Sequence, residues 1–544
     1  MLRRLAVLCI VISGCSPGSV SGGGGGGGSA GGGSAGGGSS SGGGAAAGGG
    51  SAGGGAATGG GAAGGGAATG GGAATGGGAA TGGGAGGGAT GGGGGLSGPT
   101  FYVDAAAPND NGSGTAASPK QHIPSAIALL PASGGGTVII KAGTYSGAAN
   151  DLTMLSPGTA SQWNVIKAEV DGAVIITSDL TLGGGDWYTQ FEGLHWSSSN
   201  GKSITGTHLK FLRCAFEGGP ATGNEVTLAI GTNDFTPGAS DILLEDCWVF
   251  GLGGRYKVLV YNSQNVILRR VVARHDGGWS TTDDNPEGVF SIYESKNVRV
   301  QNCIALDPAS GLINYEADYY GPANETTTTP YDNDKWQGCM TFDGPNNAFA
   351  IEGPKDVTNC RVEDFVAFQA AQGIAHNGSG NKTVTYDRIT KLGGAYGFAI
   401  WGGGGTMSVT NSIIKDSDTS FQQGAGNGGF NDTFGSSSGG AITTDPQMNG
   451  WVYPLRIEAG SALKTAGSGG GQVGAEISKR VGVSGTLFGE NGFETLTGED
   501  LWPWPNQDRI HTEMAAVSTR GFCAQGQTLT RYLFERLGAP SPYP

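Results

Sequence analysis

The line NVILRRVVA, residues 265–273, decides the fold, because its alternation of inward and outward residues returns along the chain. It recurs as DILLEDCWV from Asp241, NVRVQNCIA from Asn297, NCRVEDFVA from Asn359, TVTYDRITK from Thr383 and TMSVTNSII from Thr406. The second residues of successive copies are 24, 32, 62, 24 and 23 positions apart. A period near 24, lengthened twice by insertions, predicts the coils of a solenoid, because one coil cannot bury its apolar face alone.

The amino terminus predicts export. Arg3 and Arg4 precede an apolar run in residues 5–12 that is too short to span a bilayer, as in a secretory signal peptide. Residues 12–15, ISGC, resemble the bacterial lipobox, which implies cleavage before Cys15 and lipid attachment to it, and Ser16 resembles the outer-membrane sorting rule. The alternative is an ordinary signal peptide with a chance cysteine. We expect a protein lipid-anchored to the bacterial outer membrane or cell surface.

Residues 15–98 consist almost only of Gly, Ala, Ser and Thr, so they have little to bury and predict a disordered tether. Its root-mean-square reach is about 50 Å for a Gly-rich coil. The formal net charge of −14 argues against nucleic acid as a partner. It also argues mildly against a strongly anionic polymer, unless a local basic groove or a cation intervenes.

Residues 101–147, FYVDAAAPNDNGSGTAASPKQHIPSAIALLPASGGGTVIIKAGTYSG, carry a second signature. An apolar strand is expected at 137–141, after a glycine turn at 134–136. The segment resembles the amino-terminal cap of the pectin-lyase-like right-handed parallel β-helix proteins, which implies a short helix at 123–130 that covers the end of the core. That resemblance implies an all-β, single-stranded, right-handed parallel β-helix with an amino-terminal cap.

Domain boundaries follow from the repeat. We expect a signal peptide at 1–14, the tether at 15–98, the β-helix at 99–423 with insertions at 277–288 and 307–347, and a carboxy-terminal extension at 424–544. Leu529, Leu533, Phe534 and Leu537 have helical spacing, so the extension ends in a helical or irregular cap. Its Trp502 and Trp504 belong to that cap or, alternatively, touch a sugar.

The cysteines are interpreted as core residues. Cys247 and Cys303 occupy the same place in their repeats, as does Cys214 if LKFLRCAF is an earlier coil, which predicts a ladder of small buried side chains. Cys339 and Cys523 lie outside the pattern, and whether they pair is left open.

A second strand precedes the repeat line in each coil, as VLVYNS, FSIYES, FAIEGP, GIAHNG and FAIWGG. Its period-two pattern predicts one outward row of Tyr261, Tyr293, Glu352, His376 and Trp401, roughly 20 Å long. Aromatic faces suit sugar C–H surfaces, and Glu352 and His376 could divide base and acid work. The alternative is a solvated face whose residues align by accident.

Cations cluster near this row. Polysaccharide lyases are the commonest class of enzymes with a fold that resembles this one. The resemblance implies that Lys257 or Arg255 takes the C5 proton while Arg274 binds the uronate carboxylate. The alternative is that these are solvated or Asp-paired charges.

Long ordered insertions on a rigid scaffold are often functional. The one at 277–288 offers Trp279 as a further substrate contact, and both insertions are rich in carboxylates. These could hold Ca²⁺, although no EF-hand spacing is present and the metal is left open. The alternative is acidic, solvated loops.

The paired-Asp motif of polygalacturonases and the Arg-x-Pro-x-x-Arg motif of the main pectate lyases are not found. Our first hypothesis is a monomeric, surface-anchored polysaccharide lyase that cleaves a uronic-acid polymer by β-elimination. The alternative is a non-catalytic carbohydrate-binding or adhesive surface lipoprotein.

Overall fold

The computed structural model describes residues 98–220, 226–231, 238–277, 287–308, 316–323, 331–402, 405–437, 442–443, 445–446, 453, 455–524, 526–538 and 540–543. The predicted signal peptide, Cys15 and the tether as far as residue 97 lie outside the described residues. Among the described residues, no helix combines the length and apolar character that crossing a membrane requires.

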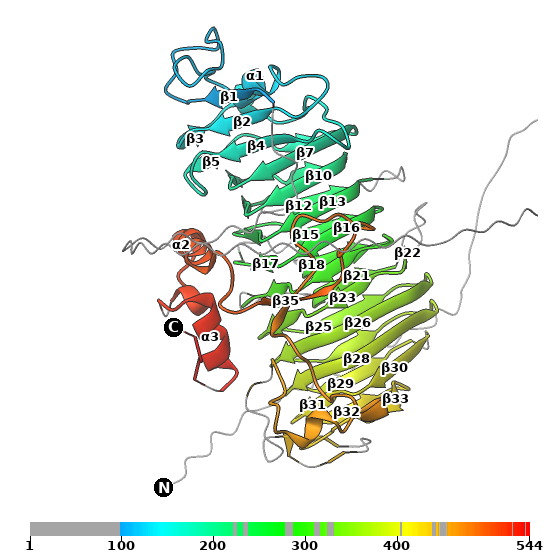
Figure 1. Cartoon of the computed structure of the whole chain (residues 1–544). Helices are drawn as coiled ribbons and strands as arrows, with labels where there is room; N and C mark the ends of the chain where they lie inside the picture. The colour runs from blue at the N-terminus through cyan, green and yellow to red at the C-terminus, as the bar shows by residue number, and fades with distance from the viewer. Residues whose placement is uncertain are drawn as a thin grey trace, which may run out of the picture. The chain divides into compact units, whose positions relative to one another are not determined.

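Parallel strands stack coil upon coil in a right-handed parallel β-helix, which confirms the predicted fold class (Figure 1). In a representative coil, β15 (Tyr256–Tyr261) is followed by β16 (Gln264–Arg269) and β17 (Val272–Ala273). The next coil then begins at β18 (Gly288–Tyr293), which pairs in parallel with β15. A coil of this kind contributes one strand to each of three series.

The first series forms a ten-stranded sheet. Its other members are β6 (Thr181–Leu182), β9 (Lys202–Ile204), β12 (Val226–Gly231), β21 (Ala317–Pro322), β25 (Asn347–Glu352), β27 (Ile374–His376), β29 (Tyr396–Ile400) and β32 (Thr419–Gln422).

The second and third series belong to one 23-stranded sheet. The second series consists, besides β16, of β1 (Thr100–Val103), β2 (Thr137–Ile140), β4 (Asn164–Ala168), β7 (Asp186–Glu192), β10 (Thr207–Leu212), β13 (Ser240–Glu245), β19 (Arg299–Gln301), β22 (Tyr331–Asp332), β23 (Lys335–Gln337), β26 (Val357–Phe368), β28 (Lys382–Leu392), β30 (Thr406–Thr410) and β33 (Gly426–Gly429). The third consists, besides β17, of β3 (Gly143–Tyr145), β5 (Val174–Ile176), β8 (His195–Ser198), β11 (Ala215–Gly218), β14 (Trp248–Phe250), β20 (Ile304–Ala305), β24 (Met340–Phe342) and β31 (Ile413–Lys415), and β26 and β28 also extend into it.

The helices lie at the two ends of the described sequence. Helix α1 (Ile123–Ile127) is shorter than the predicted helix and begins with Pro124 in its first turn. Its Ile123, Ala126 and Ile127 are buried against the first coils. The remaining elements are η1 (Ala148–Asn150), η3 (Ala462–Lys464), η4 (Ser468–Gly470), the antiparallel pair β34 (Lys479–Val481) and β35 (Leu496–Asp500), α2 (Gln507–Val517), η5 (Gly521–Cys523) and α3 (Leu529–Arg536).

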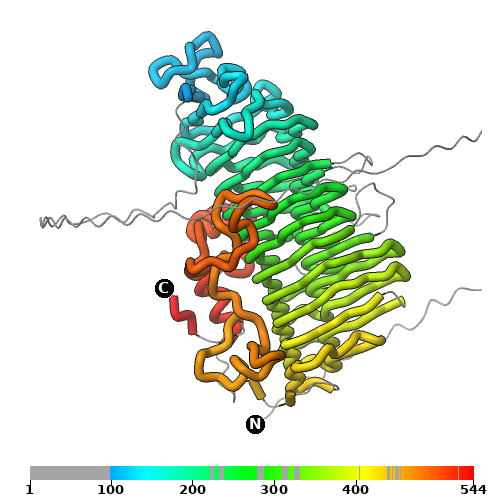
Figure 2. The backbone as a smooth tube through the Cα atoms, turned by 45° about the vertical axis from the view of Figure 1, so that its right-hand side comes forward, coloured from blue at the N-terminus to red at the C-terminus, as the bar shows by residue number. Residues whose placement is uncertain are grey.

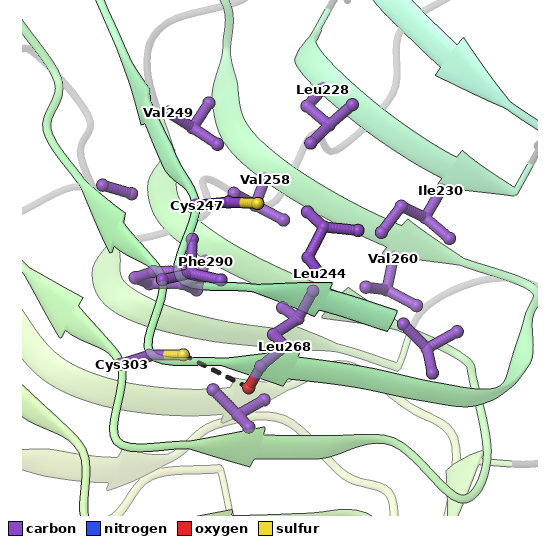
Figure 3. Packing of buried hydrophobic residues seen from close by; sticks show 14 of the residues in the cluster. Leu228, Ile230, Leu244, Cys247, Val249, Val258, Val260, Leu268, Phe290 and Cys303 are labelled. Carbon is purple, nitrogen blue, oxygen red and sulfur yellow. Dashed lines mark hydrogen bonds between the residues drawn. The ribbon is translucent and has the colours of Figure 1, made fainter. Parts of the chain in front are cut away.

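The core is filled by the inward residues of all three series. In Figure 3, Leu244, Cys247, Leu268, Phe290 and Cys303 point into this space, and the Cys303 thiol donates to the carbonyl oxygen of Leu268 (3.3 Å). Every cysteine in the described part of the chain is buried and free. The cysteines of the predicted ladder are therefore buried core residues that form no disulfide.

The 307–347 segment corrects the predicted insertion, because its described residues contribute strands to all three series. Strands β21, β23 and β24 pair in parallel with the coils on either side, so the spacing of 62 residues covers two coils. The repeat was hidden because Asp334 stands where the other copies carry an apolar residue or cysteine. Asp334 is buried there and accepts from the Val298 amide (2.7 Å).

The same coil corrects the placement of Cys339, which continues the cysteine ladder next to Cys303. Its thiol donates to the carbonyl oxygen of Val300 (3.2 Å). Cys523 lies instead against the guanidinium of Arg274 (3.2 Å), so Cys339 and Cys523 are not bonded to each other.

The carboxy-terminal segment, residues 455–543, packs back onto the outside of the 23-stranded sheet (Figures 1 and 2). Leu487 packs on Leu243 and Ile267 of the second series. Helices α2 and α3 cover an apolar strip of the third series, which consists of Ala215, Trp248, Phe250, Val272, Ile304, Leu306, Met340, Phe342, Val366 and Phe368. Trp502 and Trp504 are buried in this contact, so the alternative of a sugar contact by these two residues is wrong.

Candidate functional site

The outer face of the ten-stranded sheet brings four of the five predicted row residues into register. Tyr261 is paired with Tyr293, and Glu352 is paired with Pro322 of the additional coil. Trp401 directly follows Ile400 at the end of β29. With that additional coil the row is about 24 Å long at the usual strand spacing. We call Tyr261, Tyr293, Pro322, Glu352, Asn377 and Trp401 the outer row.

His376 does not belong to the outer row, which corrects the prediction. It pairs with Ile351 and Ile400, whose side chains face inward, and it is 0% exposed. Its Nε2 lies 2.9 Å from the Tyr386 hydroxyl. Burial lowers the pKa of His376 to about 3, so the ring is neutral at physiological pH. A slip of one residue in β27 reverses the face, and Asn377 takes the outward place.

Glu352 is the charged group of the outer row. The Tyr320 hydroxyl donates to one of its carboxylate oxygens, and the Asn377 amide donates to the other (3.3 Å). Burial, and then the charge of Glu352, raises the pKa of Tyr320, so this hydroxyl keeps its proton. Burial and the charge of Glu352 also raise the pKa of the half-buried Glu316.

A pair of stacked tyrosines lies on the same face and was not predicted from the sequence. The rings of Tyr256 and Tyr320 are 6.3 Å apart between centroids and inclined by 15°. The Tyr256 hydroxyl donates to Glu287. Gly288 lies on the strand between them, where a Cβ would approach the carbonyl oxygen of Ala317 to 2.8 Å. Tyr320 was missed because its coil was taken for an insertion.

Lys257 does not reach the outer face, which contradicts its predicted catalytic role. It is 0% exposed, and its ammonium donates to the carbonyl oxygens of Gly251 (2.7 Å) and Gly253 (2.5 Å). Burial lowers the pKa of Lys257 to about 7. A low pKa would suit a general base, but a fully enclosed amine cannot contact a polymer.

Arg274 is also an internal residue, so the predicted carboxylate clamp is wrong. The guanidinium and its partner Asp276 are both 0% exposed and lie 2.8 Å apart. The same guanidinium donates to the carbonyl oxygens of Met514 (3.0 Å) and Ser518 (3.2 Å) at the end of α2. Arg274 therefore fastens the carboxy-terminal segment to the β-helix.

Arg255 lies at the edge of the ten-stranded sheet and forms an ion pair with Glu287. Its guanidinium also lies over the Tyr256 ring, 5.6 Å from the centroid. The cation is therefore already paired with a carboxylate, that of a glutamate.

Trp279 lies outside the described residues, as does most of the insertion at 277–288. Within the residues that are described, no three or more His, Cys, Asp or Glu side chains are grouped so that they could hold a metal ion. A Ca²⁺ site stays a prediction.

Comparison with known proteins finds similarity to solved structures only. No protein-family model and no curated protein matches the chain. Among solved structures, the pectate lyase Pel9A is 14% identical, with a TM-score of 0.41, and the match covers 69% of this chain and 95% of that one. An alginate lyase from Paenibacillus sp. str. FPU-7 is 12% identical, with a TM-score of 0.32 and coverages of 64% and 98%. The A-module of the Azotobacter vinelandii mannuronan C-5 epimerase AlgE4 is 13% identical, with a TM-score of 0.34 and coverages of 59% and 94%.

Proposed function

We propose that the chain is a surface-anchored protein that binds an extracellular polysaccharide along the outer row and cleaves it at Glu352. The observation that carries this proposal is the in-register row of Tyr261, Tyr293, Glu352 and Trp401 on one sheet face. Half-buried aromatic rings offer flat apolar surfaces that suit the C–H faces of sugars. A row of about 24 Å has room for several sugar rings.

Glu352 is the group best placed to move a proton. Its carboxylate is hydrogen-bonded by Tyr320 and Asn377, which hold its orientation within the row. The β-elimination of a uronic-acid polymer needs a base for the C5 proton, and with Lys257 enclosed that role passes to Glu352. Elimination remains the first reaction to test on polyuronates.

The rival function is binding without cleavage, as an adhesive surface lipoprotein. The aromatic members of the outer row lie on both sides of Glu352, which is sufficient for binding a polymer without chemistry. A panel of polysaccharides separates the two functions through new reducing ends and through the ultraviolet absorbance of unsaturated products.

The decisive variant is Glu352→Gln, which keeps the shape of the side chain and removes its charge. Loss of acid–base catalysis should lower the rate of product formation about 10²- to 10⁴-fold while polymer binding persists. Glu499→Gln, on the exposed β35, is the matched control and should leave the rate unchanged. Product formation that survives in Glu352→Gln would refute the assignment. Binding that persists without product from any polymer would favour the rival.

Anchoring is part of the proposal and is tested separately. Replacing Cys15 by Ala should move the protein from the membrane fraction to the soluble fraction, because acyl chains supply the membrane affinity. Unchanged fractionation would show that Cys15 carries no lipid.

A further inference from the structure

The outer row holds accessible aromatic residues on both sides of Glu352. We infer that the chain cuts its polymer at internal bonds and releases oligosaccharides, rather than removing single sugars from an end, because the polymer is bound on both sides of the bond at Glu352. This inference rests on the proposed function, since it concerns the same polymer on the same outer row.

The register of the ten-stranded sheet gives the spacing of these contacts. Strands β15, β18, β21, β25 and β29 follow one another along the solenoid, with β27 between the last two (Figure 1). Tyr293 therefore lies two coils from Glu352 on one side, and Trp401 lies two coils from it on the other. Two coils correspond to about 10 Å at the usual strand spacing, so an extended polymer reaches an aromatic ring on each side of Glu352. Tyr261 continues the row one coil beyond Tyr293.

Accessibility confines the polymer to this row. The aromatic side chains of the outer row and the side chain of Glu352 are half-buried, so each keeps part of its surface in solvent. The neighbouring row on the same coils is at most 8% exposed and consists of Leu259, Ser291, Tyr320, Ala350, Ala375 and Ala399. A polymer that lay along a strand would therefore meet one accessible member of the outer row, whereas a polymer that crosses the strands meets all of them.

Each aromatic contact is held in place by its neighbours. The rings of Tyr261 and Tyr293 lie 4.5 Å apart between centroids, inclined by 47°, and together form one apolar surface. The Trp401 ring packs edge-on against Tyr396 (5.8 Å between centroids), whose hydroxyl donates to the Asn347 side-chain oxygen (2.6 Å). Rings that are already fixed lose little conformational freedom when a sugar binds, so both ends of the outer row are prepared for binding.

The outer row ends in glycines. Gly231 is paired with Tyr261 on the coil before it, and Gly424 stands at the position after Trp401 on the coil that follows. An enzyme that removes terminal sugars needs a group that stops the polymer beyond the reacting bond. Neither glycine supplies a side chain for this purpose, and a Cβ at Gly424 would meet no atom of the described residues within 4 Å. The members of the row therefore do not stop a polymer at either end.

The elimination of the proposed function fixes the products of an internal cut. Glu352 takes the C5 proton, a C4–C5 double bond forms, and the C4–O bond breaks with its electron pair on the oxygen, which takes a proton from solvent. Each cut then yields one unsaturated end and one reducing end, on two fragments that are both longer than a single sugar.

The test follows the full-length chain on polygalacturonate, alginate, xylan and arabinan. On the polymer that is cut, the viscosity of the solution should fall steeply while few new reducing ends have formed. A dyed, cross-linked gel of the same polymer should release dyed fragments, because an enzyme that acts only from an end stops at the first cross-link. The early products should be oligosaccharides of mixed length in gel filtration.

End-labelled oligomers of defined length locate the bond that is cut. Trp401→Ala and Tyr293→Ala should each lower kcat/KM on a long oligomer about tenfold. The two variants should also move the preferred bond in opposite directions along the oligomer, because each removes a contact on one side of Glu352. Tyr188→Ala, on β7 of the other sheet, is the aromatic control and should change neither the rate nor the preferred bond.

Release of terminal sugars alone, with little fall in viscosity, would overturn the inference and leave the proposed function standing. A preferred bond that moves in the same direction in both variants, or in neither, would do the same. A chain that forms no product from any of the four polymers, or whose product formation survives Glu352→Gln, would overturn the proposed function and this inference with it.

Discussion

Buried lysines stabilise the turns between the strands of this β-helix. The ammonium groups of Lys202, Lys257, Lys382 and Lys391 donate to backbone carbonyl oxygens, for example from Lys202 to Ser198 (2.9 Å) and from Lys391 to Gly393 (2.5 Å). A carbonyl oxygen buried without a partner is costly, and an ammonium offers three donors from a flexible stem. Burial places the positive charge of each ammonium away from solvent, which lowers the pKa of these lysines.

The burial of Lys391 should make the free energy of unfolding depend on pH. Burial lowers its pKa from 10.5 to about 7 in the folded chain. Between these pH values the unfolded chain binds more protons, so this residue makes the free energy of unfolding rise as the pH increases from about 7 to about 10.5. Urea unfolding of the unmodified chain and of Lys391→Met should show a difference between them that grows over this window, by about 1.4 kcal/mol for each unit of lowering. Parallel pH profiles would contradict the assignment.

Replacing Arg274 tests whether this residue has a structural or a catalytic role. Arg274→Met removes the nearer of two ion-pair partners of the buried Asp276 and leaves Arg520, which should lower the free energy of unfolding by about 3–5 kcal/mol. Arg480→Met removes a more exposed pair with Glu499 (3.3 Å) and should cost less than about 1 kcal/mol. A carboxylate clamp would instead lose activity in Arg274→Met at unchanged stability.

At the scale of elements, an amide ladder sets the register of successive coils. Asn265 donates to Asp241 (3.1 Å), Asn297 to Asn265 (3.0 Å) and Asn333 to Asn297 (2.8 Å). These four residues have φ values between 57° and 59°, where asparagine and aspartate are better tolerated than most residues. The ladder recurs where the chain enters the second series, so it aligns the bend of one coil over the bend of the next.

Asn297 is the test of this ladder. Asn297→Gly should lose two side-chain hydrogen bonds, at about 1 kcal/mol each. Asn297→Ala should lose about 1 kcal/mol more, because Ala at a φ of 58° is strained. Asn200→Ala, which removes one exposed bond to Asp179, should change stability by less than about 0.5 kcal/mol. Equal unfolding midpoints for all three variants in urea would rule the ladder out as a source of stability.

At the scale of the whole described unit, the carboxy-terminal segment decides which faces of the solenoid meet solvent. It is held by a buried cation of the solenoid, since Arg269, which is paired with Glu245 (2.9 Å), donates to the carbonyl oxygens of Val483 (2.8 Å) and Phe493 (2.9 Å) in the segment. The segment covers the 23-stranded sheet. The outer row, on the ten-stranded sheet, does not take part in these contacts.

Removing the segment should therefore expose the apolar strip of the third series. A chain that ends after Ser437 should aggregate or bind a hydrophobic dye, because Trp248, Phe250 and Met340 would lose their cover. A chain that ends after Gly538 keeps α3 and should remain monodisperse in gel filtration. A soluble, monodisperse chain ending after Ser437 would show that the strip is covered by other means.

The outer row was predictable because strand parity is a local property. Tyr261, Tyr293, Glu352 and Trp401 were placed from period-two alternation alone, and the coil period of about 24 residues predicted their alignment. His376 was misplaced because β27 is only three residues long, and a short strand does not define its own phase.

The sequence by itself determined the stacked coil, the cysteine ladder and the aromatic part of the outer row, since each follows from strand alternation and from the coil period, which are both regular spacings along the chain. Only the tertiary structure decided the roles of Lys257 and Arg274 and the coil hidden in residues 307–347. Arg274 meets the Met514 carbonyl 240 residues further along the chain, and no local pattern encodes such a contact. Packing between residues that are distant in sequence determines which charged side chains are buried. Only the charged side chains that stay accessible can take part in chemistry on a polymer.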